Sequence, residues 1–296
     1  MDIILIRQSD LSAFSRCAQQ KKLNDQAKAG LLTGGEQLSQ TAYGSVMHHA
    51  ISTLERLQFQ GRDDAVERAH ATFDHYWDPV NISAICDPVT IWAARQTYAG
   101  LLRKGHQTID LYGEHLAKDV SKLLALEIEF TLPLEVDGVV HDFHGTMDRL
   151  ALRKLSGQSY VEISDFKTGQ DQKYLRWNVQ FTAYGWATTQ RAFWTDAWGE
   201  EQGNDLYERF RLLARRGTWI SLRNGVDRQD AGWRGEQDYA RFKVAVREYV
   251  KAVELDVYPL SLKGDVCFWC RWREICGGVP VPDEQHGRPE PVAVKP

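Results

Sequence analysis

The sequence predicts an α/β fold, with one α/β core and a helical insertion near its start. One observation is a change in hydrophobic periodicity, from helical to alternating, near Leu124. Another is a set of three alternating segments separated by Asp137-Gly138 and Ser156-Gly157, dipeptides that are typical of tight hairpin turns. Helical patterns precede and follow these segments, which favours strands covered by helices.

Each element can be justified in order along the chain. A short apolar strand at 3–6 precedes a helix at 11–22 that carries Cys17, with Ser9 and Asp10 as candidate caps. The remaining predicted elements are a helix at 40–58, helical segments through 64–125 with a break at Asp87-Pro88, strands at 124–136, 139–152 and 159–168, a helix at 178–191, strands at 205–216 and 218–224 joined by a turn at Gly217, and a helix at 229–255. The polar, proline-containing tail at 278–296 is predicted to be flexible.

Composition excludes several classes of protein. The 296-residue chain contains 43% hydrophobic and 26% charged residues, which excludes wholesale disorder and fibrous repeats. The chain shows no apolar run as long as the roughly 18 residues of a membrane span, and its first residues lack the features of a signal peptide. We therefore expect a cytoplasmic protein with no membrane partner. The net charge of −4 argues against unselective coating of nucleic acid, but not against an enzyme whose carboxylates bind metal.

Two carboxylates and a lysine converge near the ends of two predicted strands. Asp165 and Lys167 are two residues apart, so both side chains lie on the same face of a strand. Asp148 ends the preceding strand and reaches that face if the two strands are neighbours. Carboxylates suit Mg²⁺ or Mn²⁺, which activates water, and a lysine can orient that water for phosphodiester cleavage. A surface Asp–Lys pair at a hairpin is the alternative interpretation.

Two further motifs add polar groups. The motif G-x-x-x-H ends at His48 on the helix at 40–58. The motif Q-x-x-x-Y places Gln180 and Tyr184 on one face of the helix after the Asp-x-Lys strand. That face is polar where a helix packed on a sheet would be apolar. A lone helical histidine is often structural, and His49 beside it leaves this choice open.

The order G-x-x-x-H, G-x-x-D-R, D-x-K-T-G and Q-x-x-x-Y resembles the PD-(D/E)XK nuclease superfamily, and within it the RecB-like branch. The resemblance implies a restriction-endonuclease-like core with a mixed sheet flanked by helices, one nuclease domain over 1–277 and a helical insertion at about 60–122. It implies a Mg²⁺- or Mn²⁺-dependent deoxyribonuclease. The implied metal ligands are His48, Asp148, Asp165 and the Phe166 carbonyl, with Lys167 as the catalytic lysine and Gln180 and Tyr184 contacting DNA or positioning that lysine. Glu127 and Glu129 are expected near the metals, without an assigned role.

Three of the five cysteines crowd together: Cys267, Cys270 and Cys276. In a cytosolic chain, such clustering indicates metal more often than disulfides. Taken with Cys17 near the start, they resemble the pattern of the iron–sulfur nucleases of the AddB type and related CRISPR-adaptation exonucleases, which implies a [4Fe–4S] cluster that joins Cys17 to the segment 261–277. A structural zinc site is the alternative. This chain departs from the family in having Ala18, not proline, after Cys17, and Cys86 is expected to be a buried thiol outside the pattern.

Together, these features predict a metal-dependent DNA exonuclease that acts on DNA ends or single strands in recombination, repair, phage DNA metabolism or CRISPR spacer processing. The chain contains no G-x-x-x-x-G-K-[ST] loop, so a helicase or CRISPR integrase would be a separate partner. The alternatives are a non-cutting DNA-end-binding module with a structural metal site, and a zinc-containing structural protein. The basic residues expected to contact phosphates are Arg149, Lys173, Arg176, Arg215 and Arg216.

Overall fold

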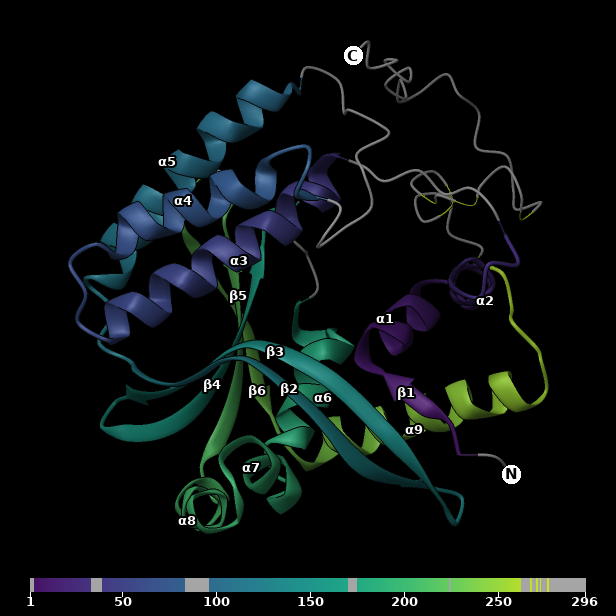
Figure 1. The fold of residues 1–296 in the computed structure, drawn as a ribbon. Helices are drawn as coiled ribbons and strands as arrows, with labels where there is room; N and C mark the ends of the chain where they lie inside the picture. Colours follow the sequence, from purple (N-terminus) through teal and green to yellow (C-terminus); the bar gives the residue numbers. More distant parts are fainter. Residues whose placement is uncertain are drawn as a thin grey trace.

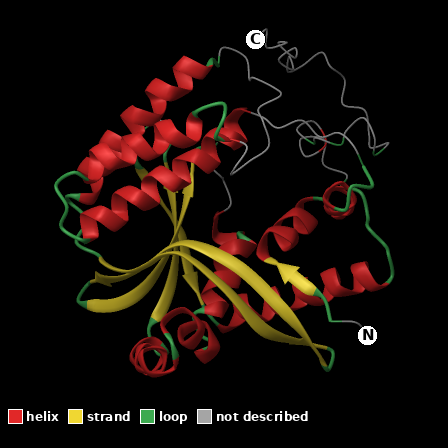
Figure 2. Cartoon of the chain, in the orientation of Figure 1, coloured by secondary structure: helices red, strands yellow, loops and turns green. Residues whose placement is uncertain are grey.

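The computed structural model describes residues 3–32, 39–82, 96–169, 175–223 and 225–261, together with Cys267, Cys270, Trp272 and Cys276. The helices are α1 (Gln8–Arg16), α2 (Ala18–Lys28), α3 (Ser39–Phe59), α4 (Ala65–Trp77), α5 (Tyr98–Leu116), α6 (Val179–Ala187), α7 (Arg191–Trp198), α8 (Glu200–Phe210) and α9 (Glu236–Glu254), with a 3-10 turn at Leu175–Trp177. The strands are β1 (Leu5–Arg7), β2 (Lys122–Val136), β3 (Val139–Leu155), β4 (Gln158–Lys167), β5 (Ala214–Ser221) and β6 (Asp227–Arg234). Figure 2 shows one sheet with helices on both sides.

Six strands of the described chain form one sheet around the long strand β3. β2 runs antiparallel along nearly all of β3. β1 pairs in parallel with the first part of β3, and β4 pairs antiparallel with its last part. β5 lies parallel to β4, and β6 lies antiparallel to β5. These parallel and antiparallel pairs confirm the predicted α/β fold with a mixed sheet.

Both predicted hairpin turns are present. Asp137 and Gly138 have φ angles of 49° and 83°, and Ser156 and Gly157 have φ angles of 51° and 83°. Two consecutive left-handed residues form the type I′ turn, whose twist matches that of the strands it joins. The turns fix the register of β2, β3 and β4, and thereby set which residues meet where β3 and β4 pair.

Helices cover the two faces of the sheet (Figure 1). On one face, α3, α4 and α5 enclose an apolar core that includes Phe73, Trp77 and Phe166. On the other face, α1, α6 and α9 pack around a larger core that includes Phe143 and Phe181. The site described below receives one side chain from α3 and one from α6, so it lies between these two helical layers.

The structure corrects the predicted strand at 205–216. The first half of this segment belongs to α8, and only its end enters β5. Leu206 and Phe210 pack into the core at helical spacing, which is the pattern of an amphipathic helix. Gly217, expected in a turn, lies inside β5 instead. A Cβ atom at Gly217 would lie 2.8 Å from the Phe181 ring, so the glycine allows α6 to approach the sheet.

Two predicted helices have different limits. β6 occupies the first part of the helix expected at 229–255, because its pairing with β5 overrides the local helical pattern, and α9 starts after it. The helix expected at 11–22 is two helices that break at Cys17, where the backbone is extended with φ −161° and ψ 112°. Ser9 and Asp10, the expected caps, lie within α1.

The tail at 278–296, Cys86 and Lys173 lie outside the described residues, so the predictions for them stay predictions. None of the helices in the described ranges combines the length and the apolar character that a membrane crossing requires.

Candidate active site

Asp148, Asp165 and Lys167 meet where β3 and β4 pair. Lys167 Nζ donates to Asp165 Oδ1 at 2.9 Å and lies 2.7 Å from Oδ2 of the same carboxylate. Asp148 Oδ2 accepts a hydrogen bond of 2.8 Å from the N–H of Phe166. The structure thus brings together the two carboxylates and the lysine, as the strand alternation predicted.

His48 reaches the same cluster from α3. Its Nε2 atom lies 2.9 Å from the Phe166 carbonyl oxygen, and its Nδ1 atom lies 3.5 Å from Asp148 Oδ2. The glycine of the G-x-x-x-H motif explains how α3 comes so close. A Cβ atom at Gly44 would lie 3.1 Å from Thr168 Oγ1, so a larger residue there would press the helix away from the end of β4.

Glu127 of β2 joins this cluster. One ligand atom each from Glu127, His48 and Asp148 can be chosen so that all three lie within 4.8 Å of one another. The backbone of Glu127 has a φ of 49°, a left-handed conformation that a strand residue rarely adopts and that is commonest at functional sites. Ser52 Oγ donates to Glu127 Oε1 at 2.6 Å and holds the carboxylate. Glu129, by contrast, has an exposed side chain outside this group.

The donor set fits a hard divalent cation. Mg²⁺ and Mn²⁺ favour carboxylate and carbonyl oxygens and also accept imidazole. Ligands at about 2.1 Å from such an ion, and at right angles to one another, lie about 3 Å apart. The 2.9 Å between His48 Nε2 and the Phe166 carbonyl oxygen matches this spacing. The 3.5 Å separation from Asp148 is made by Nδ1, the other ring nitrogen, so one ion would take only one of the two. The residues that could hold the ion are His48, Glu127, Asp148, Asp165 and Phe166 through its carbonyl.

Negative charge exceeds positive charge in this cluster. Burial raises the pKa of Asp165 to about 6; the Lys167 ammonium opposes this rise, and the charge of Asp148 adds to it. Burial alone would lower the pKa of Lys167, but the Asp165 and Asp148 carboxylates outweigh it and raise the pKa. Lys167 therefore stays a cation, while the carboxylates around it repel one another. A bound divalent ion would relieve that repulsion.

α6 contributes an amide and a phenol. The Asn178 side chain caps the helix by accepting from the Gln180 N–H at 2.8 Å. Gln180 Nε2 donates to Asp165 Oδ1 at 2.7 Å. The Tyr184 hydroxyl donates to the Thr146 carbonyl at 2.6 Å, and burial raises its pKa far above the ordinary value. The implied roles of Gln180 and Tyr184 were to contact DNA or to position the active-site lysine. Gln180 contacts Asp165, the partner of Lys167, so the placement is consistent with positioning of the lysine through that carboxylate.

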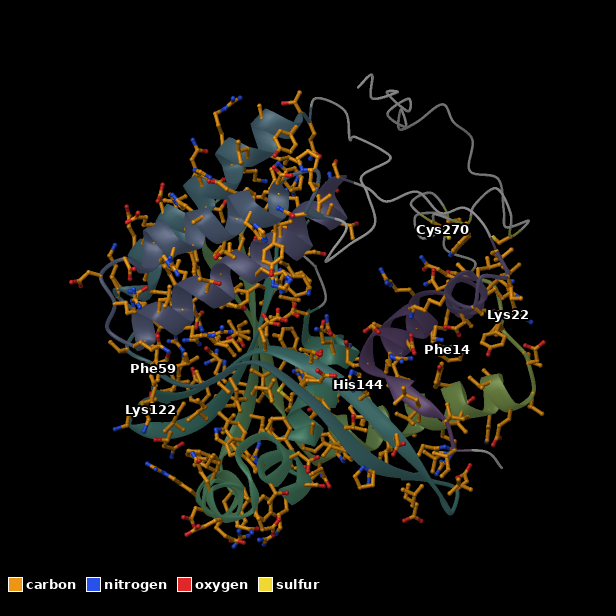
Figure 3. The ribbon with its side chains drawn as sticks, in the orientation of Figure 1. Phe14, Lys22, Phe59, Lys122, His144 and Cys270 are labelled. Carbon is orange, nitrogen blue, oxygen red and sulfur yellow. The ribbon has the colours of Figure 1, made fainter. Side chains whose placement is uncertain are left out.

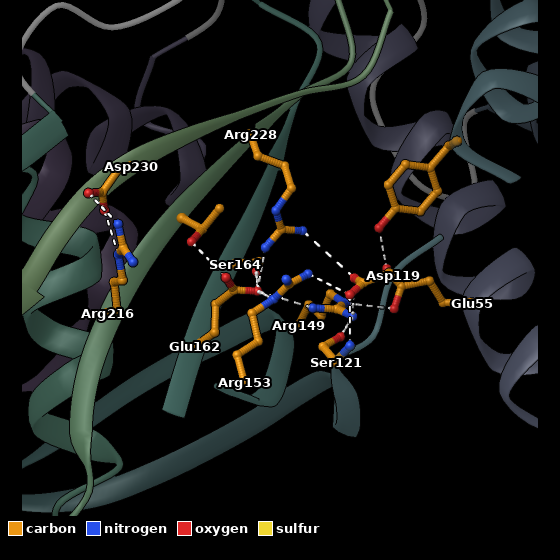
Figure 4. A network of polar contacts seen from close by, with 12 residues as sticks. Glu55, Asp119, Ser121, Arg149, Arg153, Glu162, Ser164, Arg216, Arg228 and Asp230 are labelled. Carbon is orange, nitrogen blue, oxygen red and sulfur yellow. Dashed lines mark hydrogen bonds and ion pairs between the residues drawn. The ribbon is translucent and has the colours of Figure 1, made fainter. Parts of the chain in front are cut away.

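Arg149, expected to contact DNA, is instead the centre of a buried ion network (Figure 4). It is 2% exposed, and it donates to Glu55 at 2.8 Å and to Asp119 and Glu162 at 3.3 Å. The other members are Tyr112, Ser121, Arg153, Ser164, Thr218 and Arg228. A guanidinium enclosed in this way cannot reach a phosphate, so the prediction for Arg149 was wrong.

The other basic residues divide into buried and accessible ones. Arg215 is 3% exposed and donates to the Thr188 carbonyl at 2.8 Å, so its expected phosphate contact is also wrong. Arg176 lies 3.1 Å from Asp238, and about half of its side chain is exposed. Arg216 forms a two-pronged ion pair with Asp230. Arg176 and Arg216 are therefore the described residues of the predicted set that remain accessible.

The four patterned cysteines lie in one region, beside α2. The Ser261 N–H donates to Cys17 Sγ at 3.4 Å, and Cys267 Sγ donates to the Ser261 carbonyl at 3.9 Å. Figure 3 shows Cys270 beside the helix that carries Lys22. Burial raises the pKa of the Cys270 thiol, and the neighbouring charges of Cys276, Cys17 and Cys267 raise it further.

A buried tryptophan packs between α2 and the cysteines. Trp272 is fully buried, and its indole N–H donates to Asn24 Oδ1 at 2.7 Å. Leu23 packs against Trp272 and Cys270 in a small separate core. The N-terminal helix α2 and the C-terminal cysteines are thus attached to each other by packing and hydrogen bonds.

Comparisons with known proteins bear on this arrangement. The family profile described as the PD-(D/E)XK nuclease superfamily matches residues 7–277. Among solved structures, the chain is similar to one described as "Crystal structure of SSO0001", with 12% sequence identity, coverage of 87% of this chain and 93% of that chain, and a TM-score of 0.33. No curated protein matches the sequence. Because the family match spans nearly the whole chain and includes all the motifs assembled above, this chain belongs to the PD-(D/E)XK nuclease superfamily, a superfamily of metal-dependent nucleases.

Proposed function

We propose that the protein is a Mg²⁺- or Mn²⁺-dependent DNA exonuclease of the RecB-like branch, acting on DNA ends or single strands. The observation that carries this proposal is the group of carboxylates in excess around a protonated Lys167, with the pKa of Asp165 raised to about 6. A divalent ion held there would lower the pKa of a water molecule and offset the charge of the scissile phosphate. The order of the four motifs supports the branch.

The protein residues supply positioning and charge. Lys167 Nζ, held by both oxygens of Asp165, is placed to donate a hydrogen bond to the attacking water or to a phosphate oxygen. Gln180 fixes Asp165 from the other side, so the lysine geometry exists before DNA arrives. Tyr184 ties α6 to β3 through the Thr146 carbonyl and keeps Gln180 in place.

End-labelled linear DNA and covalently closed circular DNA test this proposal together. With Mg²⁺ or Mn²⁺, an exonuclease shortens single- or double-stranded linear DNA and leaves the circles intact. Asp165→Asn should remove cleavage, and Asp137→Asn, in the exposed ion pair with Arg247 at the β2–β3 turn, should not. Cutting of circles would indicate an endonuclease. Tight binding of ends with no cleavage would favour the non-cutting DNA-end-binding module, and strong cleavage in EDTA would contradict the metal site.

We also propose that Cys17, Cys267, Cys270 and Cys276 bind a [4Fe–4S] cluster. Their common location, and the mutual charge effects on Cys270, support a shared thiolate site. Such a cluster would connect α2 to the C-terminal segment, and its binding free energy would add to folding. The alternative occupant is one structural zinc ion.

Anaerobically purified protein tests the cluster. It should be brown and carry about four iron and four sulfide per chain. Cys270→Ser should lose the colour and lower the melting temperature, whereas Cys86→Ser should change neither. A colourless protein with one tightly held zinc would replace the cluster by a zinc site. Full metal binding by Cys17→Ser would exclude the connection between the two ends of the chain.

A further inference from the structure

The helices α4 and α5 carry the same motif: His70-x-x-x-Asp74 on α4 and His106-x-x-x-Asp110 on α5. Residues four apart lie on one face of a helix, separated by one turn. A pair of ligands at this spacing can chelate a single ion. Neither motif belongs to the nuclease site or to the cysteine site.

Close packing brings the two motifs together. A Cβ atom at Gly105 would lie 2.3 Å from Phe73 Cζ, and a Cβ atom at Gly113 would lie 3.1 Å from Val66 Cγ2. The order of these contacts shows that the helices run antiparallel. Glycine at 105 lets the two backbones meet next to His106, whose ring contacts the Phe73 ring edge-on at 6.0 Å between centroids.

The four side chains already face one another across the helix pair. His70 Nε2 lies 3.0 Å from Asp110 Oδ1, and His106 Nε2 lies 2.6 Å from Asp74 Oδ1. The two imidazole rings stack, with centroids 4.5 Å apart and an interplanar angle of 18°. The Nε2 atom of His70 is buried and lacks a hydrogen bond of good geometry within the described part of the chain. An imidazole nitrogen is therefore available as a ligand.

We propose that these four residues form a second cation site, for a divalent transition metal such as Zn²⁺, that connects α4 to α5. Two imidazoles and two carboxylates supply four ligands of the type that Zn²⁺ takes, and the carboxylates balance its charge. Imidazole ligands also favour Zn²⁺, Ni²⁺ and Cu²⁺ over Mg²⁺. The oxygen-rich active site has the opposite preference, so the two sites select different ions.

Binding of an ion would require the four side chains to rotate toward one another. Within the described residues, the group with His48 is the one whose ligand atoms all lie within 4.8 Å, whereas His70 and His106 form two separate ion pairs. The side chains of Asp74 and Asp110 are 51% and 55% exposed, so they can change rotamer and admit an ion from solvent.

The ion would stabilise the helical layer that covers the active-site helix. Phe73 of α4 packs edge-on against Tyr43 of α3, with ring centroids 6.0 Å apart. Tyr43 lies on the same helix as His48, five residues before it. Ligands that bind only the folded state raise its stability in proportion to the logarithm of their concentration. The resistance of this layer to unfolding would thus depend on the supply of transition metal.

Equilibrium dialysis of the full-length protein against Zn²⁺, followed by elemental analysis, tests the site. Wild type should bind one more zinc per chain than His70→Ala/His106→Ala, because the active site and the cysteines are unchanged in both. Zinc should raise the melting temperature of wild type by roughly 2–4 °C more than that of the double variant. His75→Ala, on the same helix outside the site, should behave as wild type. Magnesium should change the melting temperatures of wild type and the double variant by the same amount.

Equal zinc content and equal thermal shifts in wild type and the double variant would overturn the proposal. If the double variant does not fold by circular dichroism, Asp74→Asn/Asp110→Asn decides, because it keeps the shape and removes the two charged ligands. Zinc binding at wild-type stoichiometry by that variant would also overturn the site. Neither result depends on whether the protein cleaves DNA.

Discussion

Two clusters of charged residues adjoin each other at β3. Asp148 belongs to one cluster and the next residue, Arg149, to the other, and α3 contributes His48 to the first and Glu55 to the second. In the network around Arg149, the carboxylates of Glu55, Asp119 and Glu162 are matched by arginines. Burial alone would raise the pKa of Glu162, but Arg228, Arg153 and Arg149 outweigh it and hold the pKa below the ordinary value.

The active-site cluster has the opposite balance. Glu127, Asp148 and Asp165 lie around one ammonium group, and burial together with the charge of Asp148 raises the pKa of Asp165 to about 6 against the opposing effect of Lys167. Both clusters contain buried carboxylates, Asp165 in one and Glu55 in the other, so a buried carboxylate alone does not distinguish them. They differ in whether positively charged side chains balance the carboxylates. A matched network stabilises the fold, whereas carboxylates in excess form a site that needs a cation.

Removal of one active-site carboxylate should give the largest effect. Asp165→Asn should lower the cleavage rate by about a thousandfold, because a metal ligand and the partner of Lys167 are lost. DNA affinity and the urea midpoint should stay near those of wild type. Single-turnover rates and fluorescence anisotropy measure the two quantities. Wild-type turnover in this variant would mean that the active site lies elsewhere.

Removal of Arg149, the cation at the centre of the matched network, should instead lower the stability of the fold. Arg149→Ala should reduce the free energy of unfolding by about 3–5 kcal/mol, because it leaves buried carboxylates unpaired. Arg216→Ala breaks a more exposed ion pair with Asp230 and should cost below about 1 kcal/mol. Urea denaturation of both variants gives the comparison. Similar losses would show that the network contributes no more than a surface pair.

A smaller effect is expected at the strained glutamate. Glu127→Gln should weaken Mn²⁺ binding by about tenfold, because one charge is removed from the group that faces the ion. Glu129→Gln, two residues along β2 and exposed, should leave the affinity unchanged. Mn²⁺ titration followed by electron paramagnetic resonance measures both. Equal affinities would exclude Glu127 from the metal site.

The smallest effect is a pH dependence of stability. The pKa of Glu162 is lowered from 4.5 in the folded protein, so its contribution is fully present above pH 4.5 and is lost as the pH falls through the native pKa. Between pH 5 and pH 3, wild type should therefore lose more of its free energy of unfolding than Glu162→Gln does. Urea midpoints at a series of pH values, in EDTA, test this. Parallel curves would show that the arginines do not lower this pKa.

Several features of the site were predictable because they depend on local geometry. The turns at Asp137-Gly138 and Ser156-Gly157 have a sequence signature, and they determine which strands are neighbours. Two-residue spacing put Asp165 and Lys167 on one face, and four-residue spacing put Gln180 and Tyr184 on one helix face. Short-range periodicity was sufficient for these contacts.

Other features depend on long-range contacts that no local pattern encodes. Arg149 resembled a phosphate contact because its partner Glu55 lies 94 residues away and its partner Asp119 lies 30 residues away. The role of Glu127 depends on a left-handed backbone within a strand and on the Ser52 hydroxyl from another helix. Pairing of β6 with β5 likewise overrode a helical pattern.

The meeting of Cys17 with the C-terminal cysteines also sets an order of events during synthesis. Cys267 leaves the ribosome about 250 residues after Cys17. At elongation rates of about 5–20 residues per second, this interval is roughly 12–50 s. During that interval the sheet and both helical layers can form, while the Cys17 thiol waits without the other three. Loading of the proposed cluster or ion would therefore be a late step that follows synthesis of nearly the entire chain. A chain that stops between Tyr184 and Cys267 would contain every nuclease motif and still lack the connection between Cys17 and the C-terminal cysteines.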